Sequence, residues 1–372
     1  MLFIPHKHLY ISDASYISSD EPDYKEVITD ANLRRRMGRL LKMAVWCGLK
    51  SLDGVPSERV AGIITSTGAG FMKDTISFGS SIFDREETLL NPSPFMQSTF
   101  NTASGYIALI RKIHAYNTTY VQQADGFAAS LVDAAMLLDD AGEGNVALVG
   151  AFDEVTPEVD VIRQRLGLYR VGDGFLPLGE GAAAFLLSAA MTTDGSESCR
   201  ATESSTGPGG DDGSESDSGR DGDEAGSESA SEHGGDANSE CSTGPLRESE
   251  SASEHGGESG SESSSEPLHE YGGTSSRSLN GTKDGNAALR FCGLANLSDL
   301  PKCAENPIAE LFGINAGVNV ISCADHVESL GAFRSLLPVL LCKLISEQQI
   351  PDGYTAIVDD VNENGVIVLL HK

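Results

Sequence analysis

The sequence has few basic residues, few aromatic residues and no long apolar run. Lys and Arg total 26 against 55 Asp and Glu, a formal net charge of −29, and aromatic residues make up 6% of the 372 residues. So few cations argue against binding to a nucleic-acid backbone or to an anionic membrane surface. Without a run of ~18 apolar residues, we expect no transmembrane helix and no membrane insertion.

Cysteine patterns that hold metals or redox centres are also missing. The seven cysteines are scattered without a CxxC pair, and the eight histidines include no HExxH. We therefore predict no metal site and no cofactor. The first residues lack the long apolar region of a secretory signal, and an odd number of thiols suits a reducing compartment. These features predict a cytoplasmic protein.

Most of the acidity belongs to one segment. Residues 191–270 hold 21 acidic and three basic residues, a net charge of −18, and Ser227–Gly235 recurs verbatim as Ser249–Gly257. Residues 193 to about 285 have almost no large apolar side chain and cannot bury enough surface to offset their ordering entropy. We predict a disordered acidic insertion over 191–285. It is either a tolerated surface-loop insertion or an acidic interaction or phosphorylation segment.

The insertion separates two parts, 1–190 and 286–372, in which apolar strand patterns alternate with helical ones. In the first part the patterns predict strands over Val60–Thr65, Thr118–Gln122, Asn145–Ala151 and Gly181–Ser188, and helices over Asp30–Leu52, Asn101–Tyr116 and Ala128–Leu138. In the second they predict strands over Leu289–Leu294, Val318–Ser322, Tyr354–Val358 and Gly365–Leu370, and helices over Ala304–Phe312 and Ser329–Ile345. This alternation is typical of an α/β protein whose sheet is covered on both faces.

Several motifs in this order resemble the β-ketoacyl synthases of the thiolase-like superfamily. Gly172–Leu187, which reads GDGFLPLGEGAAAFLL, is similar to the family's "DGFVxGEGAGxLVLE" segment. Asn101–Leu109 resembles its "NxASGxIA" helix start, Asn145–Ala151 one of its buried strands, and Gly365–Leu370 its last strand. The resemblance implies a layered αβαβα fold built from two related halves, of which the second is shortened here.

The catalytic residues of that family are largely missing. The family places a nucleophilic Cys at a strand-to-helix elbow, and two His residues that assist decarboxylation. In this sequence the Cys position falls on Gln123 or Ala124, depending on the alignment. No His occurs in Gly293–Ser298, where the first is expected, and His326 is a weak remnant candidate for the second. The resemblance therefore identifies no catalytic residue.

The lost Cys is typical of chain-length-factor subunits, which pair with an active synthase in polyketide and aryl-polyene pathways. Gln123–Gly126 resembles their altered elbow. The resemblance predicts a non-catalytic subunit of fatty-acid or polyketide biosynthesis that binds a catalytic β-ketoacyl synthase, or a second copy of itself, and works with an acyl carrier protein. Aromatic side chains around the elbow are candidates for the interface or for walls of an acyl tunnel, or else belong to the core: Phe95, Phe100, Tyr106 and Phe127.

Two other functions remain open. An active acyltransferase or condensing enzyme would need another nucleophile, such as Ser130 or Thr119, with His326 as base. A stand-alone pseudoenzyme would act as a binding module. Carrier proteins are acidic and favour basic partners, and two small basic clusters could serve or could be solvated helix faces: Arg34, Arg35, Arg36, Arg39 and Lys42, and the pair Arg111 and Lys112.

Overall fold

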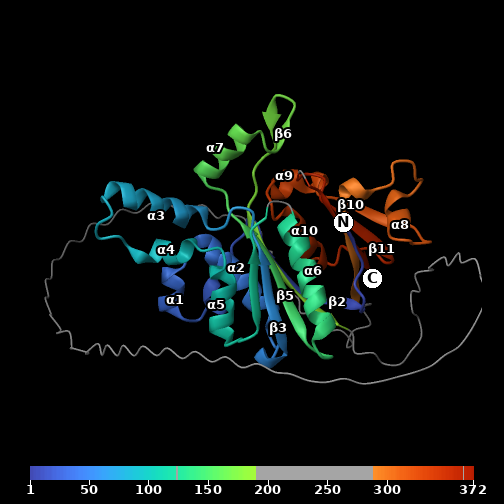
Figure 1. The fold of residues 1–372 in the computed structure, drawn as a ribbon, viewed down its shortest axis with the longest axis horizontal. Helices are drawn as coiled ribbons and strands as arrows, with labels where there is room; N and C mark the ends of the chain where they lie inside the picture. Colours follow the sequence, from blue (N-terminus) through green and yellow to red (C-terminus); the bar gives the residue numbers. More distant parts are fainter. Residues whose placement is uncertain (123–124, 190–287, 363) are drawn as a thin grey trace, which may run out of the picture. The chain divides into compact units, whose positions relative to one another are not determined.

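The computed structural model describes residues 1–122, 125–189, 288–362 and 364–372 (Figure 1). The strands in these ranges are β1 Leu2–Phe3, β2 Leu9–Ile17, β3 Val60–Ser66, β4 Tyr116–Tyr120, β5 Val146–Asp153, β6 Arg170–Val171, β7 Gly174–Phe175, β8 Gly181–Ala189, β9 Leu289–Asn296, β10 Val318–Ser322, β11 Tyr354–Val358 and β12 Val366–His371. The α-helices are α1 Ala31–Arg36, α2 Arg39–Ser51, α3 Met72–Asp84, α4 Pro92–Ser98, α5 Thr102–Arg111, α6 Asp125–Asp140, α7 Pro157–Leu166, α8 Pro307–Leu311, α9 Val327–Leu330 and α10 Leu336–Ser346.

One large sheet joins the two parts of the chain, in the order β10-β11-β12-β9-β2-β8-β5-β3-β4, with β1 paired to β9. In the first half, β3 runs parallel to β5, β5 antiparallel to β8, and β8 antiparallel to β2. In the second half, β10, β11, β12 and β9 repeat that order and those directions. Within the described residues β4 has no counterpart in the second half. The prediction of two related halves, the second shortened, is confirmed.

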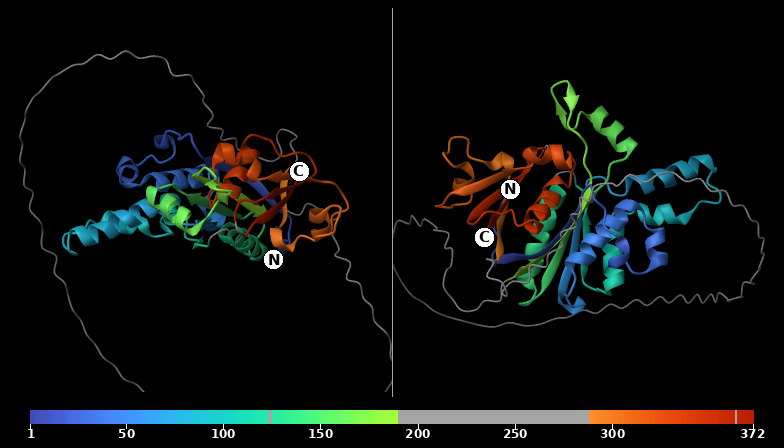
Figure 2. Two further views of the ribbon diagram at one scale, coloured as in Figure 1. Left: turned by 90° about the horizontal axis from the view of Figure 1, so that it is seen from above. Right: turned by 180° about the vertical axis from the view of Figure 1, so that it is seen from behind.

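Helices cover the sheet in layers (Figures 1 and 2). The apolar faces of α6 and α10 lie in one core cluster, between strands of the first half and strands of the second. A second cluster places α2 and α5 on the outer face of the first half. A smaller third cluster places α8 on the outer face of the second half. The resulting helix–sheet–helix–sheet–helix order confirms the predicted layered α/β fold.

The small residues of the central strands allow the helices to approach closely. In β8, Ala182 and Ala184 face α2, while Ala183 faces the central helix layer. On α2, Gly48 likewise allows α5 to approach closely, because a Cβ there would overlap the side chain of Ile107. Strands buried on both faces read as continuous apolar runs, and for this reason the sequence located β3, β5 and β8 to within about two residues.

Three predicted helices differ from the structure. The stretch Asp30–Leu52 is two helices, α1 and α2, because the chain becomes extended at Met37 and Gly38. The helix predicted to reach Tyr116 ends at Arg111, where Lys112 adopts a left-handed conformation, and β4 then starts two residues before the predicted strand. The helix predicted over Ser329–Ile345 is divided by Gly331 at φ +77°, with α10 beginning only at Leu336.

Two pairs of elements lie outside the layers. Helices α3 and α4 pack on each other at the left of Figure 1, and no residue of α3 is buried. Helix α7 and the hairpin β6–β7 stand at the top of the same view. None of the helices in the described ranges is long and apolar enough to cross a bilayer. The predicted insertion 191–285 lies wholly outside the described residues, and its boundaries stay predictions.

Candidate functional site

The junction between β4 and α6 is the place where the family resemblance expects its nucleophile. Gln123 and Ala124, the two candidate elbow positions, lie outside the described residues. The elements that flank these two residues pack closely together. An added Cβ on Gly126 of α6 would lie 3.5 Å from the Ser66 Cβ of β3 and 3.6 Å from the Tyr120 carbonyl oxygen of β4. Helix α6 therefore starts directly beside the ends of β3 and β4. In the sequence, the stretch between β4 and α6 contains no cysteine.

Three buried thiols of the described residues do not replace the missing nucleophile. Cys47, Cys323 and Cys342 are buried, and burial raises the pKa of each thiol. The Cys47 Sγ donates to the Ala182 carbonyl at 3.4 Å, and the Cys342 Sγ to the Ala184 carbonyl at 3.6 Å. A buried thiol with a raised pKa forms little thiolate, which is the reactive species.

Among the described residues, no basic group bonds to either of the two alternative hydroxyl nucleophiles. The Ser130 Oγ is fully buried and donates to the Phe127 carbonyl at 2.7 Å, a local helix bond. The Thr119 Oγ1 lies 2.7 Å from the Thr65 Oγ1 and 3.3 Å from the Ser104 Oγ. Activation of a hydroxyl needs an adjacent base, and the partners of both groups are a carbonyl or other hydroxyls.

His326 lies in the second half, at the end of the 3-10 helix Ala324–His326 that follows β10. Its side chain is half-buried. Its backbone N–H donates to the Cys323 carbonyl at 3.0 Å, and its own carbonyl accepts from the Ser329 Oγ at 3.0 Å. These contacts fix the backbone of His326 but give its imidazole no partner that would prepare it as a catalytic base. Its role as a remnant stays a prediction.

A buried carboxylate organises the loop that follows β3. Asp153, the last residue of β5, accepts hydrogen bonds at Oδ1 from the Thr67 Oγ1 at 3.0 Å and from the backbone N–H groups of Gly68 at 2.8 Å and Ala69 at 3.2 Å. Its Oδ2 accepts from the Ser335 Oγ. Burial raises the pKa of Asp153. The amides of this glycine-rich loop therefore hold an internal carboxylate, so they are not free to stabilise the oxyanion of a substrate.

Asp153 is not among the residues predicted from the sequence. A signal was available, because an acidic pair directly follows the apolar run of the β5 strand. The second member of that pair, Glu154, accepts the backbone N–H of Lys73 at 3.0 Å, in the first turn of α3. Both carboxylates thus hold the segment that leads from β3 into α3.

The four candidate aromatic residues separate into two groups. Phe95 is 54% exposed and packs against Phe78 with ring centroids 5.1 Å apart, and Phe100 is exposed and covers Gly70. Phe127, by contrast, is buried in the core, edge-on to Phe185 of β8, and Tyr106 is half-buried against the α2–α5 cluster. Phe95 and Phe100 are therefore accessible to a partner, whereas Phe127 belongs to the packing of α6 on the sheet.

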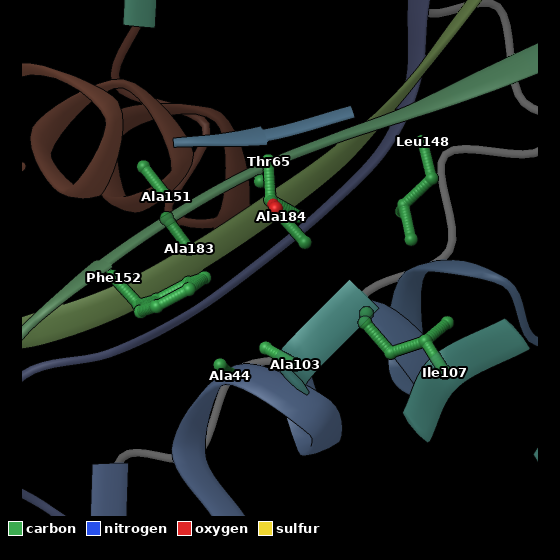
Figure 3. Close-up of a pocket in the computed structure, with 11 residues that line it drawn as sticks. Ala44, Thr65, Ala103, Ile107, Leu148, Ala151, Phe152, Ala183 and Ala184 are labelled. Atoms are coloured by element: carbon green, nitrogen blue, oxygen red, sulfur yellow. The ribbon is translucent and has the colours of Figure 1, made fainter. Parts of the chain in front are cut away.

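A small cavity lies between α2, α5 and the sheet of the first half (Figure 3). Its volume is about 10 Å³. Residues with small or apolar side chains make most of its lining, including Ala44, Ala103, Ile107, Leu148, Ala184 and Thr65. A space of this size holds at most one water molecule, so this cavity does not accommodate an acyl chain.

The larger basic cluster is partly neutralised. Arg39 forms ion pairs with Glu21 and Glu180, and the Arg34 guanidinium donates to the Ile28 carbonyl. Arg35 donates to the Asn32 Oδ1 at 3.3 Å. In the second cluster, the Arg111 guanidinium donates to the Val55 carbonyl. Most of these cations therefore support local structure, which favours solvated helix faces over a concentrated docking surface.

The paired half-sheets and the glycine-rich segment before β8 are the features expected of a ketosynthase fold. A family profile described as "Beta-ketoacyl synthase, N-terminal domain" matches residues 12–199, just over half of the chain. The chain belongs to the β-ketoacyl synthase family. No curated protein matches its sequence.

Solved structures agree on the fold at low sequence identity. "The ishigamide ketosynthase/chain length factor" is 12% identical over 98% of this chain and 99% of that chain, with a TM-score of 0.56. A type II polyketide synthase acyl-carrier protein in complex with its ketosynthase is 14% identical over 98% and 99%, with a TM-score of 0.55. A ketosynthase with its chain length factor from Xenorhabdus doucetiae is 17% identical over 49% and 79%, at a TM-score of 0.37 that supports no argument.

Proposed function

We propose that this chain is a non-catalytic subunit of the chain-length-factor type, which pairs with an active β-ketoacyl-acyl-carrier-protein synthase. The observation that carries the proposal is the lack of a cysteine in the sequence between β4 and α6 of a chain from the β-ketoacyl synthase family. No cysteine occurs in the sequence between Cys47 and Cys199, so the junction of β4 and α6 has no nucleophile that could hold an acyl thioester. Under this proposal the partner supplies the Cys and the His residues of the reaction.

Strand β4 supports the pairing because it is the last strand at its end of the sheet. Its sequence, Tyr116-Asn-Thr-Thr-Tyr120, contains neither a charged residue nor a proline, and Tyr116 and Asn117 are exposed. Proteins normally protect a free sheet edge with charges, prolines or bulges. An edge without that protection suits continuation of the sheet into a partner subunit.

The neighbouring α3–α4 pair supports the same face. Large apolar side chains are exposed on these helices and the turns that follow them: Phe83, Leu89, Phe95, Met96 and Phe100. Exposed aromatic and Met side chains that lie close together are typical of interfaces, where they act as anchors. We call this set the α3–α4 patch. It lies on the segment between β3 and β4, so one partner could contact both the patch and the β4 edge.

The proposed role is to complete the partner's acyl-binding site and to set the length of its product, in fatty-acid or polyketide (aryl-polyene-like) biosynthesis in the cytoplasm. An acyl carrier protein would deliver the growing chain to the pair. Because β4 reads nearly the same in both directions, antiparallel pairing with a second copy would also place tyrosine opposite tyrosine. A homodimer is therefore the form expected when the synthase is absent.

Co-expression with the ketosynthase encoded nearest to this chain tests the proposal. We expect the two proteins to co-purify and form product with the carrier protein, whereas this chain alone takes up no acyl group. The change Asn117→Lys on β4 places a charge at the edge and should abolish both co-purification and product. The matched control is Val320→Lys on β10, which is 58% exposed at the opposite end of the same sheet, and it should leave the pair intact.

Two results would overturn the proposal. One is stable acyl loading of the purified chain in the absence of a synthase, which would make it an enzyme in its own right. The other is a pair that survives Asn117→Lys but is lost with Val320→Lys, which would move the interface to the other end of the sheet. Analytical ultracentrifugation of both variants measures the assembly independently of activity.

A further inference from the structure

A carboxylate of α6 lies beside the β4 edge and is held there by the strand itself. Asp133 accepts hydrogen bonds at Oδ2 from the hydroxyl of Tyr116 at 3.0 Å and from the hydroxyl of Tyr120 at 3.1 Å. The two tyrosines point to the same face of β4 and are four residues apart. The carboxylate therefore lies between them, level with Thr118 at the middle of the strand.

The side chains of β4 are bonded to helices on both faces of the strand. Tyr116 and Tyr120 bond to Asp133 of α6, whereas Asn117 on the opposite face donates to the Ser104 carbonyl of α5 at 3.1 Å. Because β4 is the last strand at this end of the described sheet, its outer backbone groups are not used by another strand of the described residues. Another chain could pair with them without breaking these side-chain bonds.

Asp133 has no counter-ion within the described ranges of the chain. The ion pairs found there involve other carboxylates. Burial and the negative charge of Asp133 together raise the pKa of Tyr120 to about 12, and they raise the pKa of Tyr116 as well. When a subunit contact excludes water, such a carboxylate is stabilised by an incoming cation and destabilised by an incoming anion.

A second copy of this chain would bring a charge of the same sign. Antiparallel pairing of β4 with itself about Thr118 places Tyr116 opposite Tyr120 of the other copy. The two Asp133 carboxylates then lie on the same face of the joined sheet and at the same level, one on each side of the two-fold axis. Like charges at matching positions on paired strands are destabilising, and each copy also carries a net charge of −29.

Met136 adds apolar surface next to Asp133. It follows Asp133 by three residues on α6, so the two side chains lie on the same side of the helix, and Met136 is 59% exposed. Methionine is enriched in protein interfaces. A partner that covers Met136 also removes water from Asp133, and a basic side chain then gains more from the carboxylate than it would in open solvent.

We propose that Asp133 selects the subunit that pairs with β4: the partner brings a lysine or arginine to the level of Thr118, and a second copy of this chain is disfavoured. The inference rests on the proposed pairing with a ketosynthase, and it adds the chemistry of the side chain that this partner presents. A homodimer through β4 is then weak and gives way to the mixed pair when the synthase is present.

Mixing two forms of the full chain tests the charge selection without the synthase. Asp133→Lys is the surrogate partner, because it has the same β4 edge and carries a cation at the required position. Sedimentation of labelled wild type should show that it binds Asp133→Lys ~10-fold more tightly than it binds wild type at low salt, and high salt should remove the gain. The matched control is Asp140→Lys, the same charge change at the exposed last residue of α6, and it should give no gain.

Asp133→Asn provides a second measurement if Asp133→Lys does not fold, since its amide oxygen still accepts from the tyrosine hydroxyls. We expect this variant to self-associate ~3-fold more tightly than wild type at low salt. It should also bind the ketosynthase encoded nearest to this chain ~10-fold more weakly, the size typical of a lost hydrogen bond between charged groups.

The outcomes separate this inference from the proposed function. No gain in the mixed pair, together with no gain in self-association of Asp133→Asn, would overturn the selection by Asp133. Equal binding of wild type and Asp133→Asn to the synthase would overturn it as well, and would leave the pairing itself standing. Failure of the wild-type chain to bind the synthase would instead overturn the proposed function and the partner named here.

Discussion

Asp153 and Ser335 join the two halves of the fold through a hydrogen bond of 2.6 Å between the Ser335 Oγ and the Asp153 Oδ2. Asp153 ends β5 of the first half, and Ser335 directly precedes α10 of the second half. Both side chains are buried. Because the other carboxylate oxygen holds the loop after β3, a single residue ties that loop to the helix layer between the half-sheets.

Loss of the Asp153 carboxylate should therefore destabilise the whole fold. Asp153→Ala leaves several buried donors without an acceptor, and we expect the free energy of unfolding to fall by ~3 kcal/mol or more. Ser335→Ala removes one donor and should cost ~1.5–3 kcal/mol. Urea denaturation followed by circular dichroism measures both. Asp84→Ala, on the exposed end of α3, is the control and should change little; equal effects of all three variants would contradict this account.

The glycine-rich segment before β8 packs backbone against backbone. The Gly179 N–H donates to the Ala332 carbonyl at 3.2 Å, and the Ala332 N–H donates to the Pro177 carbonyl at 2.7 Å. A Cβ on Gly179 would overlap the Leu330 carbonyl oxygen, and one on Gly331 would overlap the Gly179 backbone. The motif that marks the family thus serves here to bring the two halves into contact.

The matched pair Gly179→Ala and Gly172→Ala separates close packing from backbone conformation. Gly172 has φ +58° in the β6–β7 turn, and nothing lies within 4 Å of an added Cβ. We expect Gly172→Ala to lower the free energy of unfolding by ~1 kcal/mol, the cost of a left-handed alanine. Gly179→Ala must displace backbone and should cost ~3 kcal/mol or more. Similar urea midpoints for the two variants would contradict this account, because they would mean that the backbone at this contact shifts at little cost in stability.

Strands with continuous apolar runs could be predicted from the sequence, whereas the central strand β2 and the helix ends could not. The apolar runs of β5 and β8 are unambiguous, and the very apolar helix predicted over Ala128–Leu138 lies within α6. The break between α1 and α2 was missed because helical spacing continues on both sides of Gly38, whose amide is held by the Gln97 Oε1 at 2.9 Å, 59 residues away in sequence. A local sequence pattern cannot predict a tertiary contact between residues so far apart in the chain.

The same limit applies to the functional surfaces. The missing elbow Cys is a property of one sequence position, so it could be identified from the sequence. The Asp153–Ser335 bond joins residues 182 positions apart in the sequence, and the pairing of β2 with β9 places Tyr10 opposite Arg290. Register between distant strands follows from packing of the whole sheet, and no local motif encodes it.

Burial predicts which thiols of the described residues react. Cys303 is exposed, whereas Cys47, Cys323 and Cys342 are buried with raised pKa values. Because iodoacetamide reacts with thiolate, Cys303 should be alkylated in the native protein and the other three only after unfolding in urea. Mass spectrometry of the digested protein after short labelling times measures the order. Rapid native labelling of Cys342 would contradict the packing of α10 on β8.

Asp13 gives the fold a pH dependence that one substitution should remove. It lies on β2 at the irregularity between Ile11 and Asp13, and burial raises its pKa to about 7, with Lys50 opposing the shift and Asp53 adding to it. The unfolded value is about 4. A carboxyl with a raised pKa binds its proton more tightly in the folded state, so its contribution to stability declines as pH rises from about 4 to about 7 and is constant above that range.

Asp13→Asn keeps the shape without the charge, so we expect the variant to be more stable than wild type at pH about 8 and nearly equal to it at pH about 4. Urea titrations across this range measure the difference, with Asp84→Asn as a control for an exposed carboxyl. A gap between Asp13→Asn and wild type that does not change with pH would mean that Asp13 stays ionised in the folded protein.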